Sequence, residues 1–201
     1  MNNSQKIKRL VGISILSAIV VVLQLISNYI PFGPVSITLA LIPIVVGAIV
    51  YGPYGGFILG LVLGVMVCTA PTTAGFLQFT FFGTVIVCLL KSSIAGLIAG
   101  YVFKWIRNYN LILAIVLASL IVPIVNTGLF AVASLTIFLP LIEKAANAEN
   151  VNAVYYLFIG MIGYNFIIEF LVNSILSPVV IRIVELYGIH KKIGSDVNLT
   201  K

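Results

Sequence analysis

The sequence predicts an all-α integral membrane protein, a bundle of six transmembrane helices with both termini in the cytoplasm. Three observations support this fold class. Of the 201 residues, 61% are hydrophobic and only 8% are charged, whereas a water-soluble domain carries roughly 25% charged residues. The apolar runs approach the length of about 20 residues that crosses a bilayer. Lys and Arg are also distributed unevenly between these runs, which is typical of membrane topology.

Six apolar segments account for most of the chain. The first follows a basic N-terminus and ends at Pro31, because proline cannot continue a helix. Its apolar run is longer than that of a signal peptide, so we expect a retained helix. Gly and Pro at 52–56 separate the second and third segments, and Pro123 is expected to kink the fifth. The expected helices of this single membrane domain, 1–201, cover residues 10–30, 36–51, 55–68, 80–105, 111–142 and 153–184.

Positive charges predict the orientation in the membrane. With six helices, one side of the membrane holds Lys6, Lys8, Arg9, Lys104, Arg107, Arg182, Lys191, Lys192 and Lys201, and the other holds Lys144 alone. Cytoplasmic connections carry an excess of Lys and Arg. We therefore expect cytoplasmic termini and outer loops at 31–36, 69–79 and 143–152.

The second and third expected helices are short for a membrane crossing and are interrupted by Gly and Pro. Such segments point to a binding cavity in transport proteins. Local thinning of the bilayer, or a hairpin held by its neighbours, explains them equally well. Small residues recur every fourth position in the third and fourth helices, at Gly56, Gly60, Gly64, Gly96 and Gly100, and this spacing predicts close packing of helix backbones.

Two ionisable residues, Lys91 and Glu169, lie inside expected membrane helices at similar depth. A charge near the bilayer centre costs about 2.5–3.5 kcal/mol on insertion scales, so it requires a partner, a cavity or a function. One interpretation is a mutual ion pair that orders the bundle. A second is that Lys91 faces a water-filled cavity and meets an anionic ligand. The remaining alternatives are a Lys91 that snorkels to the membrane interface and a Glu169 that stays neutral.

Uncharged polar residues gather near these charges. Asn165, Glu169 and Asn173 are spaced by four and share one helix face. Such a polar stripe in a membrane helix faces protein or water. An interhelical hydrogen bond explains any single Asn, whereas the cluster favours a binding site. The candidate substrate-binding residues are Lys91, Asn126, Thr127, Tyr164, Asn165, Glu169, Asn173 and, in the outer loop with Thr72 and Thr73, Gln78.

Other classes of function lack supporting residues. The basic residues lie at helix ends and do not alternate with aromatic residues, which argues against a nucleic-acid interface. Cys68, Cys88 and His190 are isolated, so we expect no metal site and no disulfide framework. No phosphate-binding GxxxxGK[ST] loop and no hydrolase motif occurs. We therefore expect neither an enzyme nor a bound cofactor.

Several motifs carry a resemblance to a known family. Ser36-Ile-Thr-Leu-Ala-Leu-Ile-Pro43 and Gly47-Ala-Ile-Val-Tyr-Gly-Pro-Tyr-Gly-Gly56 are followed by the Lys91 helix and by Pro123-Ile-Val-Asn-Thr-Gly128. In this order they resemble the substrate-binding S components of energy-coupling factor (ECF) transporters. The similarity extends from residue 6 to about residue 185.

The resemblance implies a vitamin-binding subunit of a bacterial plasma membrane importer. It implies partners as well, a transmembrane coupling subunit and two ATPase subunits. In the family an Ala-xxx-Ala pair on the first helix contacts the coupling subunit, and the matching positions here are Ser14 and Ala18. The family's ligand site lies between the later helices, under the outer loops.

The expected substrate is a water-soluble vitamin. The motifs are closest to the pantothenate-type branch, and a ligand carboxylate suits Lys91. The many aromatic residues keep riboflavin and folate as alternatives. The rival function is a stand-alone, proton-coupled carrier of a small anion, in which Glu169 exchanges the proton. A structural or assembly protein is the third interpretation.

Overall fold

The computed structural model describes residues 3–29, 31–32, 35–36 and 38–186. Along the chain the elements are α1 (Asn3–Asn28), β1 (Pro31–Phe32), β2 (Val35–Ser36), α2 (Leu41–Val50), α3 (Pro53–Cys68), η1 (Pro71–Thr73), α4 (Ala74–Phe79), α5 (Phe81–Ile106), α6 (Leu111–Thr136), α7 (Leu139–Ala148), α8 (Ala153–Tyr155), the π-helical stretch η2 (Tyr156–Gly163) and α9 (Tyr164–Leu186). The strands form a two-residue antiparallel pair with Pro31 opposite Ser36.

Four helical segments of the described chain are long and apolar enough to cross a membrane: α1, α5, α6 and the continuous run Ala153–Glu185. A fifth span results if α3 and the segment Pro71–Phe79, which meet at a bend of 74°, count as one. The remaining apolar helix, α2, has ten residues and is about 15 Å long. A helical membrane fold is therefore confirmed, and the count of six spans stays a prediction.

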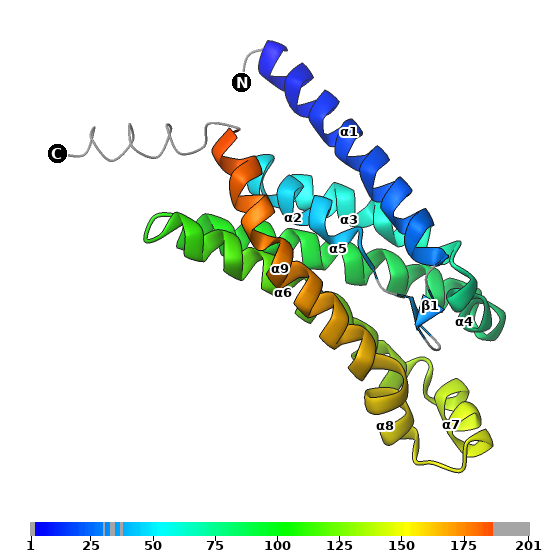
Figure 1. Ribbon diagram of the computed structural model, residues 1–201. Helices are drawn as coiled ribbons and strands as arrows, with labels where there is room; N and C mark the ends of the chain where they lie inside the picture. Colours follow the sequence, from blue (N-terminus) through cyan, green and yellow to red (C-terminus); the bar gives the residue numbers. More distant parts are fainter. Residues whose placement is uncertain (1–2, 30, 33–34, 37, 187–201) are drawn as a thin grey trace.

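The helices form an elongated bundle (Figure 1). Helices α5 and α6 pack side by side, α9 packs on α6, and α1 runs along the outside of α2 and α3. Helices α4 and α7 and the strand pair lie at one end, while α1 begins and α9 ends at the other. Helix α2 is almost wholly buried between its neighbours.

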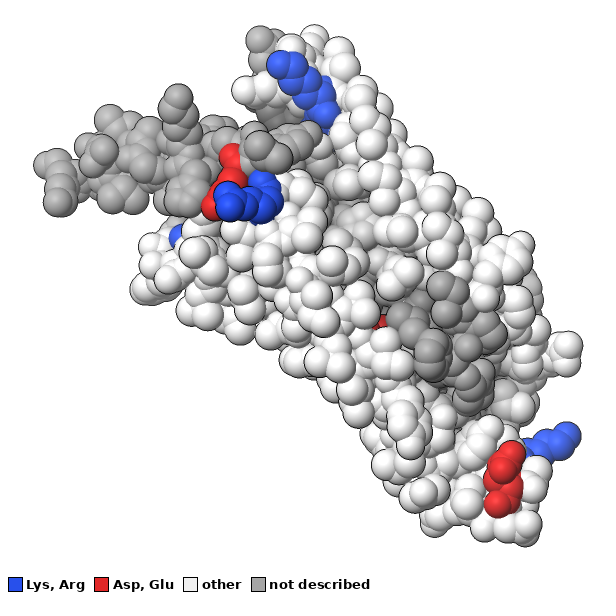
Figure 2. Space-filling model, viewed as in Figure 1, with Lys and Arg blue, Asp and Glu red and all other residues white. Residues whose placement is uncertain are grey.

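Charged residues mark the two ends of the bundle. Figure 2 shows Lys and Arg side chains gathered where α1 begins and α9 ends, with a separate basic side chain near α7. The described basic residues at the first end are Lys6, Lys8, Arg9, Lys104, Arg107 and Arg182, and Lys144 belongs to α7. This arrangement agrees with the predicted orientation, which stays a prediction.

Glycine permits the close contact between α3 and α5. A Cβ atom added to Gly60 would lie 2.6 Å from the Ser93 Cα atom, and one added to Gly64 would lie 2.6 Å from the Cys88 carbonyl oxygen. Gly56 and Gly96 face each other in the same way. The predicted packing role of these glycines is confirmed. Their contact positions the α5 segment that carries Lys91.

The start of α3 depends on glycine for a second reason. Gly52, the residue before the helix, has a φ of 80°, in the left-handed region that other residues rarely adopt. Pro53 then occupies the first turn of the helix. N–H groups at this position have no acceptor within the helix, so the missing N–H of Pro53 costs no hydrogen bond. The expected Gly-Pro connection between α2 and α3 is therefore a tight turn.

Several expected boundaries differ from the structure. The stretch 69–79, expected as a loop, contains η1 and α4. The fifth expected helix, 111–142, ends at Thr136, and the expected loop 143–152 is largely the end of α7. The break before α7 follows from Pro140, which lacks an N–H and would clash with the carbonyl four residues earlier. Pro123, by contrast, lies within the continuous helix α6.

The first two helices also begin elsewhere than expected. Helix α1 starts at Asn3, because its polar first turns extend beyond the apolar run. Helix α2 starts at Leu41 rather than near residue 36, because Val35 and Ser36 pair with β1. The last expected helix, 153–184, is one continuous helical run, but its residues Tyr156–Gly163 form the π-helical stretch η2.

Candidate functional site

A polar cavity lies inside the bundle, toward the end that carries α4 and α7. The empty space between its side chains is about 740 Å³, including the part that opens to solvent. Pockets for small organic ligands fall in the range of about 300–1,000 Å³. The cavity is lined by Gln24, Thr38, Val67, Thr72, Thr73, Phe76, Thr84, Val87, Cys88, Lys91, Asn126, Thr127, Phe130, Phe138, Met161, Ile162, Asn165 and Glu169.

Lys91 supplies the positive charge of the cavity. It lies in the middle of α5, and its Nζ atom sits 5.3 Å from the centroid of the Phe130 ring on α6. A cation over an aromatic face is attracted by about 0.5–2 kcal/mol, depending on how far it is desolvated. Phe130 therefore holds the ammonium group at the cavity without neutralising it.

Glu169 supplies the carboxyl group of the cavity. Its side chain on α9 is only 1% exposed. The Oε1 atom accepts hydrogen bonds from the backbone N–H of Thr38 at 2.9 Å and from Asn165 Nδ2 at 3.3 Å. Thr38 precedes α2, so this carboxylate joins the first third of the chain to the last helix.

Lys91 and Glu169 do not form an ion pair. Among the described residues, one ion pair has an N···O distance within 4.0 Å. It joins Arg182 and Glu185 on the surface of α9. The mutual-pair interpretation of the two intramembrane charges is therefore wrong for this structure. Each charge faces the same cavity with its own set of protein contacts, Phe130 for Lys91 and two N–H donors for Glu169.

Three buried oxygen atoms around the cavity have no hydrogen-bond partner among the described residues. They are Gln24 Oε1, Asn165 Oδ1 and Glu169 Oε2. The same three side chains use their other polar atoms: Gln24 Nε2 donates to Asn28 Oδ1 at 3.0 Å, and Asn165 Nδ2 donates to Glu169. The cavity therefore presents oxygen atoms that can accept hydrogen bonds from a bound molecule.

Aromatic side chains form one wall. The Phe76 ring of α4 meets the rings of Phe130 and Phe138 edge-on, at centroid distances of 5.7 and 5.0 Å. The Thr84 hydroxyl lies 2.8 Å from the carbonyl oxygens of both Phe76 and Thr80, and its contact with Phe76 ties α4 to α5. This wall excludes water from one side of the cavity and strengthens electrostatic interactions there.

The structure brings five of the predicted site residues to the cavity: Lys91, Asn126, Thr127, Asn165 and Glu169. The Ser92 hydroxyl donates to Asn126 Oδ1 at 3.4 Å, so the Asn126 amide is oriented from within α5.

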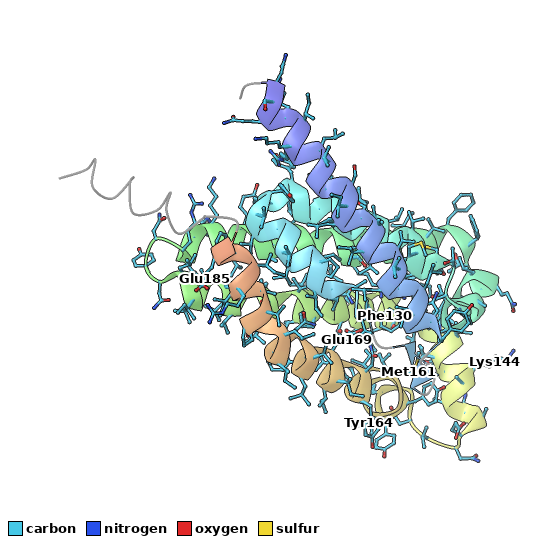
Figure 3. The ribbon with its side chains drawn as sticks, turned by 45° about the horizontal axis from the view of Figure 1, so that its top comes forward. Phe130, Lys144, Met161, Tyr164, Glu169 and Glu185 are labelled. Carbon is cyan, nitrogen blue, oxygen red and sulfur yellow. The ribbon has the colours of Figure 1, made fainter. Side chains whose placement is uncertain are left out.

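Three predicted site residues lie outside the cavity lining. Asn173 is buried one turn further along α9 and donates to the Glu169 carbonyl oxygen at 2.8 Å, so it supports the helix beside the site. Tyr164 is 68% exposed and lies on the outer surface of the bundle, whereas Glu169 and Phe130 lie within it (Figure 3). Gln78 is exposed on α4, because the opposite side of that short helix turns Phe76 inward.

Sequence reasoning missed Gln24, Thr38 and the aromatic wall. Gln24 carried a usable signal, because an amide inside an otherwise apolar membrane run needs a polar partner. Thr38 acts through its backbone N–H, which leaves no signature in the side-chain sequence. Nothing in the pattern distinguished Phe76, Phe130 and Phe138 from the other Phe residues.

The positions matching the family's coupling contact lie on α1. Ser14 and Ala18 are both exposed, and the Ser14 hydroxyl is satisfied within the helix by the Leu10 carbonyl oxygen at 3.0 Å. Two small exposed residues one turn apart leave a shallow surface on which another helix can pack closely.

The fold and the cavity together define a class, a multi-pass helical membrane protein with an internal polar site of small-molecule size. The chain belongs to the substrate-specific components of ECF transporters, since the family model described as "ECF transporter, substrate-specific component" matches residues 8–181. No curated protein and no solved structure matches the chain. The expected family is thus confirmed.

Family membership establishes the general role of the chain. It is a substrate-specific subunit of an ECF transporter, and this is a family of transporter components rather than of enzymes. Such components bind small-molecule substrates and work with a membrane coupling subunit and ATPases.

Proposed function

We propose that this chain captures pantothenate, an aliphatic vitamin with a carboxylate group, from outside the cell for an ATP-driven importer. Family membership supports the transport role. The observation that carries the choice of ligand is Lys91, whose ammonium group lines the cavity and is not paired with a carboxylate of the described residues.

An anionic ligand would complete the charge arrangement of the cavity. Hydrogen bonds to charged groups contribute about 1.5–3 kcal/mol, and the surrounding apolar wall limits competition from water. Glu169 is held by Thr38 and Asn165 and lies beyond ion-pair distance of Lys91. A ligand that places its carboxylate at Lys91 and its polar remainder near Glu169 contacts both ionisable residues of the cavity.

The aromatic wall favours an aliphatic ligand over a flat one. Phe76 meets Phe130 and Phe138 at steep angles of 70° and 74°, so these rings offer no parallel pair between which a flat ring system would stack. The Lys91 ammonium already occupies one face of Phe130. These contacts support pantothenate over riboflavin and folate.

The direction of capture follows from the charge distribution. The cavity lies toward the end of the bundle that carries α4 and α7, away from the basic cluster at the start of α1. Under the positive-inside rule the basic end is cytoplasmic. The cavity then faces the outside, under the strand pair and the segment 69–79. Both termini then lie on the cytoplasmic side of a bacterial plasma membrane, and α2 is one of six spans.

Calorimetry on the purified chain in detergent tests the ligand. Pantothenate should bind, whereas riboflavin and folate should not. Lys91→Met should weaken pantothenate binding about tenfold to a hundredfold. Lys144→Met is the matched control, because Lys144 lies on α7 away from the cavity (Figure 3), and it should bind as the native chain does. Equal affinity of the native chain and Lys91→Met would refute the role of Lys91.

Energy coupling is tested separately. We propose that Ser14 and Ala18 contact the transmembrane coupling subunit and that two ATPase subunits drive import. Uptake of labelled pantothenate should then require these partners in cells that express the chain. Accumulation driven by a proton gradient in cells without them would instead support the stand-alone carrier.

A further inference from the structure

Buried oxygen atoms of the cavity that lack a hydrogen-bond partner indicate which groups the ligand bears besides its carboxylate. Four buried side-chain oxygens lack a hydrogen-bond partner among the described residues, and three of them, on Gln24, Asn165 and Glu169, belong to cavity-lining side chains. The fourth, on Ser134, does not line this cavity. Buried polar groups in native proteins are almost always hydrogen-bonded, so this concentration at one site requires an explanation.

Several hydrogen-bond donors of the cavity lining are already engaged by other protein groups. The Thr38 N–H and Asn165 Nδ2 both donate to Glu169 Oε1. The hydroxyls of Thr73 and Thr84 donate to backbone carbonyls, at 2.8 Å in each case. The Lys91 ammonium lies over the Phe130 ring, where the proposed function assigns it to the ligand carboxylate. The three unpartnered oxygens can therefore accept hydrogen bonds from a bound molecule.

The acceptors come from two elements that are far apart in sequence. Gln24 belongs to α1, and Asn165 and Glu169 lie one turn apart on α9. Gln24 is 1% exposed, and its Nε2 atom is held by Asn28, which leaves Oε1 as the free atom of the amide. Lys91, on α5, lines the same cavity and lies beyond ion-pair distance of Glu169.

We propose, on the basis of the function proposed above, that the cavity selects a carboxylate ligand that also bears hydrogen-bond donors, hydroxyl or amide N–H groups. The ligand donates hydrogen bonds to Gln24 Oε1, Asn165 Oδ1 and Glu169 Oε2. Its carboxylate binds the Lys91 ammonium group. Gln24 is thus a specificity-determining residue contributed by the first helix. Carboxylates without such donors are rejected, because they leave buried acceptors unpaired.

Pantothenate meets this requirement with two hydroxyl groups and an amide N–H. Its dideoxy analogue, N-(3,3-dimethylbutanoyl)-β-alanine, keeps the carboxylate and the amide but lacks both hydroxyls. The pair isolates the hydroxyl contribution while the charge at Lys91 is unchanged. Lipoate and nicotinate extend the comparison to carboxylates that carry neither hydroxyl nor amide donors.

Calorimetry of the full-length chain tests the proposal. The native chain should bind pantothenate at least tenfold more tightly than its dideoxy analogue. Gln24→Met should reduce this preference severalfold by lowering the affinity for pantothenate more than that for the analogue. Gln78→Met is the matched control, because Gln78 is exposed outside the cavity lining, and it should keep the native preference.

The two proposals fail in different ways. Equal affinity for pantothenate and its dideoxy analogue would overturn the acceptor proposal and show that the three oxygens are satisfied by water. If pantothenate binding still fell on Lys91→Met, the carboxylate role would stand. Binding of lipoate or nicotinate in place of pantothenate would also overturn the acceptor proposal, whereas failure of every carboxylate to bind would overturn both. If Gln24→Met does not fold, the analogue comparison on the native chain decides.

Discussion

The contact between α3 and α5 makes Gly60 a sensitive position. In Gly60→Ala the new Cβ atom would lie 2.6 Å from the Ser93 Cα atom, against an ordinary contact distance of at least 3.4 Å. The neighbouring atoms are backbone, and the Ser92 carbonyl oxygen lies closer still, so the two helices must separate by at least about 0.8 Å. Overpacking of this kind costs about 1–3 kcal/mol. We expect a steric loss of that size relative to a Gly→Ala substitution that meets no neighbour.

Gly128→Ala is the matched control. Gly128 lies within α6, and an added Cβ atom would meet nothing within 4 Å. Both substitutions replace a helical Gly by Ala and share the same gain in helix propensity, of about 1 kcal/mol. The difference between the two variants therefore isolates the steric cost at Gly60.

Unfolding in mixed micelles with increasing SDS measures this difference. The readout is the reactivity of the Cys88 thiol, which is buried in α5, in a Cys68→Ser background. Gly60→Ala should unfold at a lower SDS fraction than Gly128→Ala. Unfolding of both variants at the same SDS fraction would refute the packing argument.

Three further predictions concern the site and its partners. Phe130→Leu should weaken pantothenate binding about two- to thirtyfold in calorimetry, because the ammonium group loses its aromatic contact; unchanged affinity would show that the ring does not position Lys91. Ser14→Trp and Ala18→Trp should abolish cellular uptake but leave binding by the purified chain unchanged, since both side chains are exposed on α1; normal uptake would remove them from the coupling contact. Thr84→Val should lower thermal stability by about 0.5–1.5 kcal/mol, because it removes the hydrogen bond to the Phe76 carbonyl oxygen; an unchanged unfolding temperature would contradict this.

Patterns in the sequence predicted the parts of the fold that depend on composition and spacing. Helix α5 was expected at 80–105 and spans Phe81–Ile106, because its apolar run lies between clear breaks. Small residues spaced by four predicted the close contact around Gly60. The same spacing placed Asn165, Glu169 and Asn173 on one helix face, where hydrogen bonds join them.

Other features depend on tertiary contacts that leave no periodic signal. The segment 69–79 lacks the length and apolarity of a membrane helix, yet α4 forms there and is tied to α5 by Thr84. The side of α4 that faces the cavity is set by this packing, so Phe76 rather than Gln78 lines the site. The carboxylate of Glu169 depends on a backbone donor at Thr38, which residue identity does not reveal.

Tyr164 illustrates the limit of assigning a cluster from sequence proximity. It precedes Asn165 by one residue, and successive helical residues are separated by about 100° around the axis. When Asn165 faces the cavity, Tyr164 therefore turns toward the outside of the bundle, where its side chain is exposed.

The central claim is that Lys91 anchors a ligand carboxylate inside the cavity. The most direct test is the ratio of the dissociation constants for panthenol and pantothenate, which differ only in an alcohol group replacing the carboxylate. For the native chain we predict a ratio of at least about ten, and for Lys91→Met a ratio close to one. The same ratio in both proteins, whatever its value, would contradict the claim.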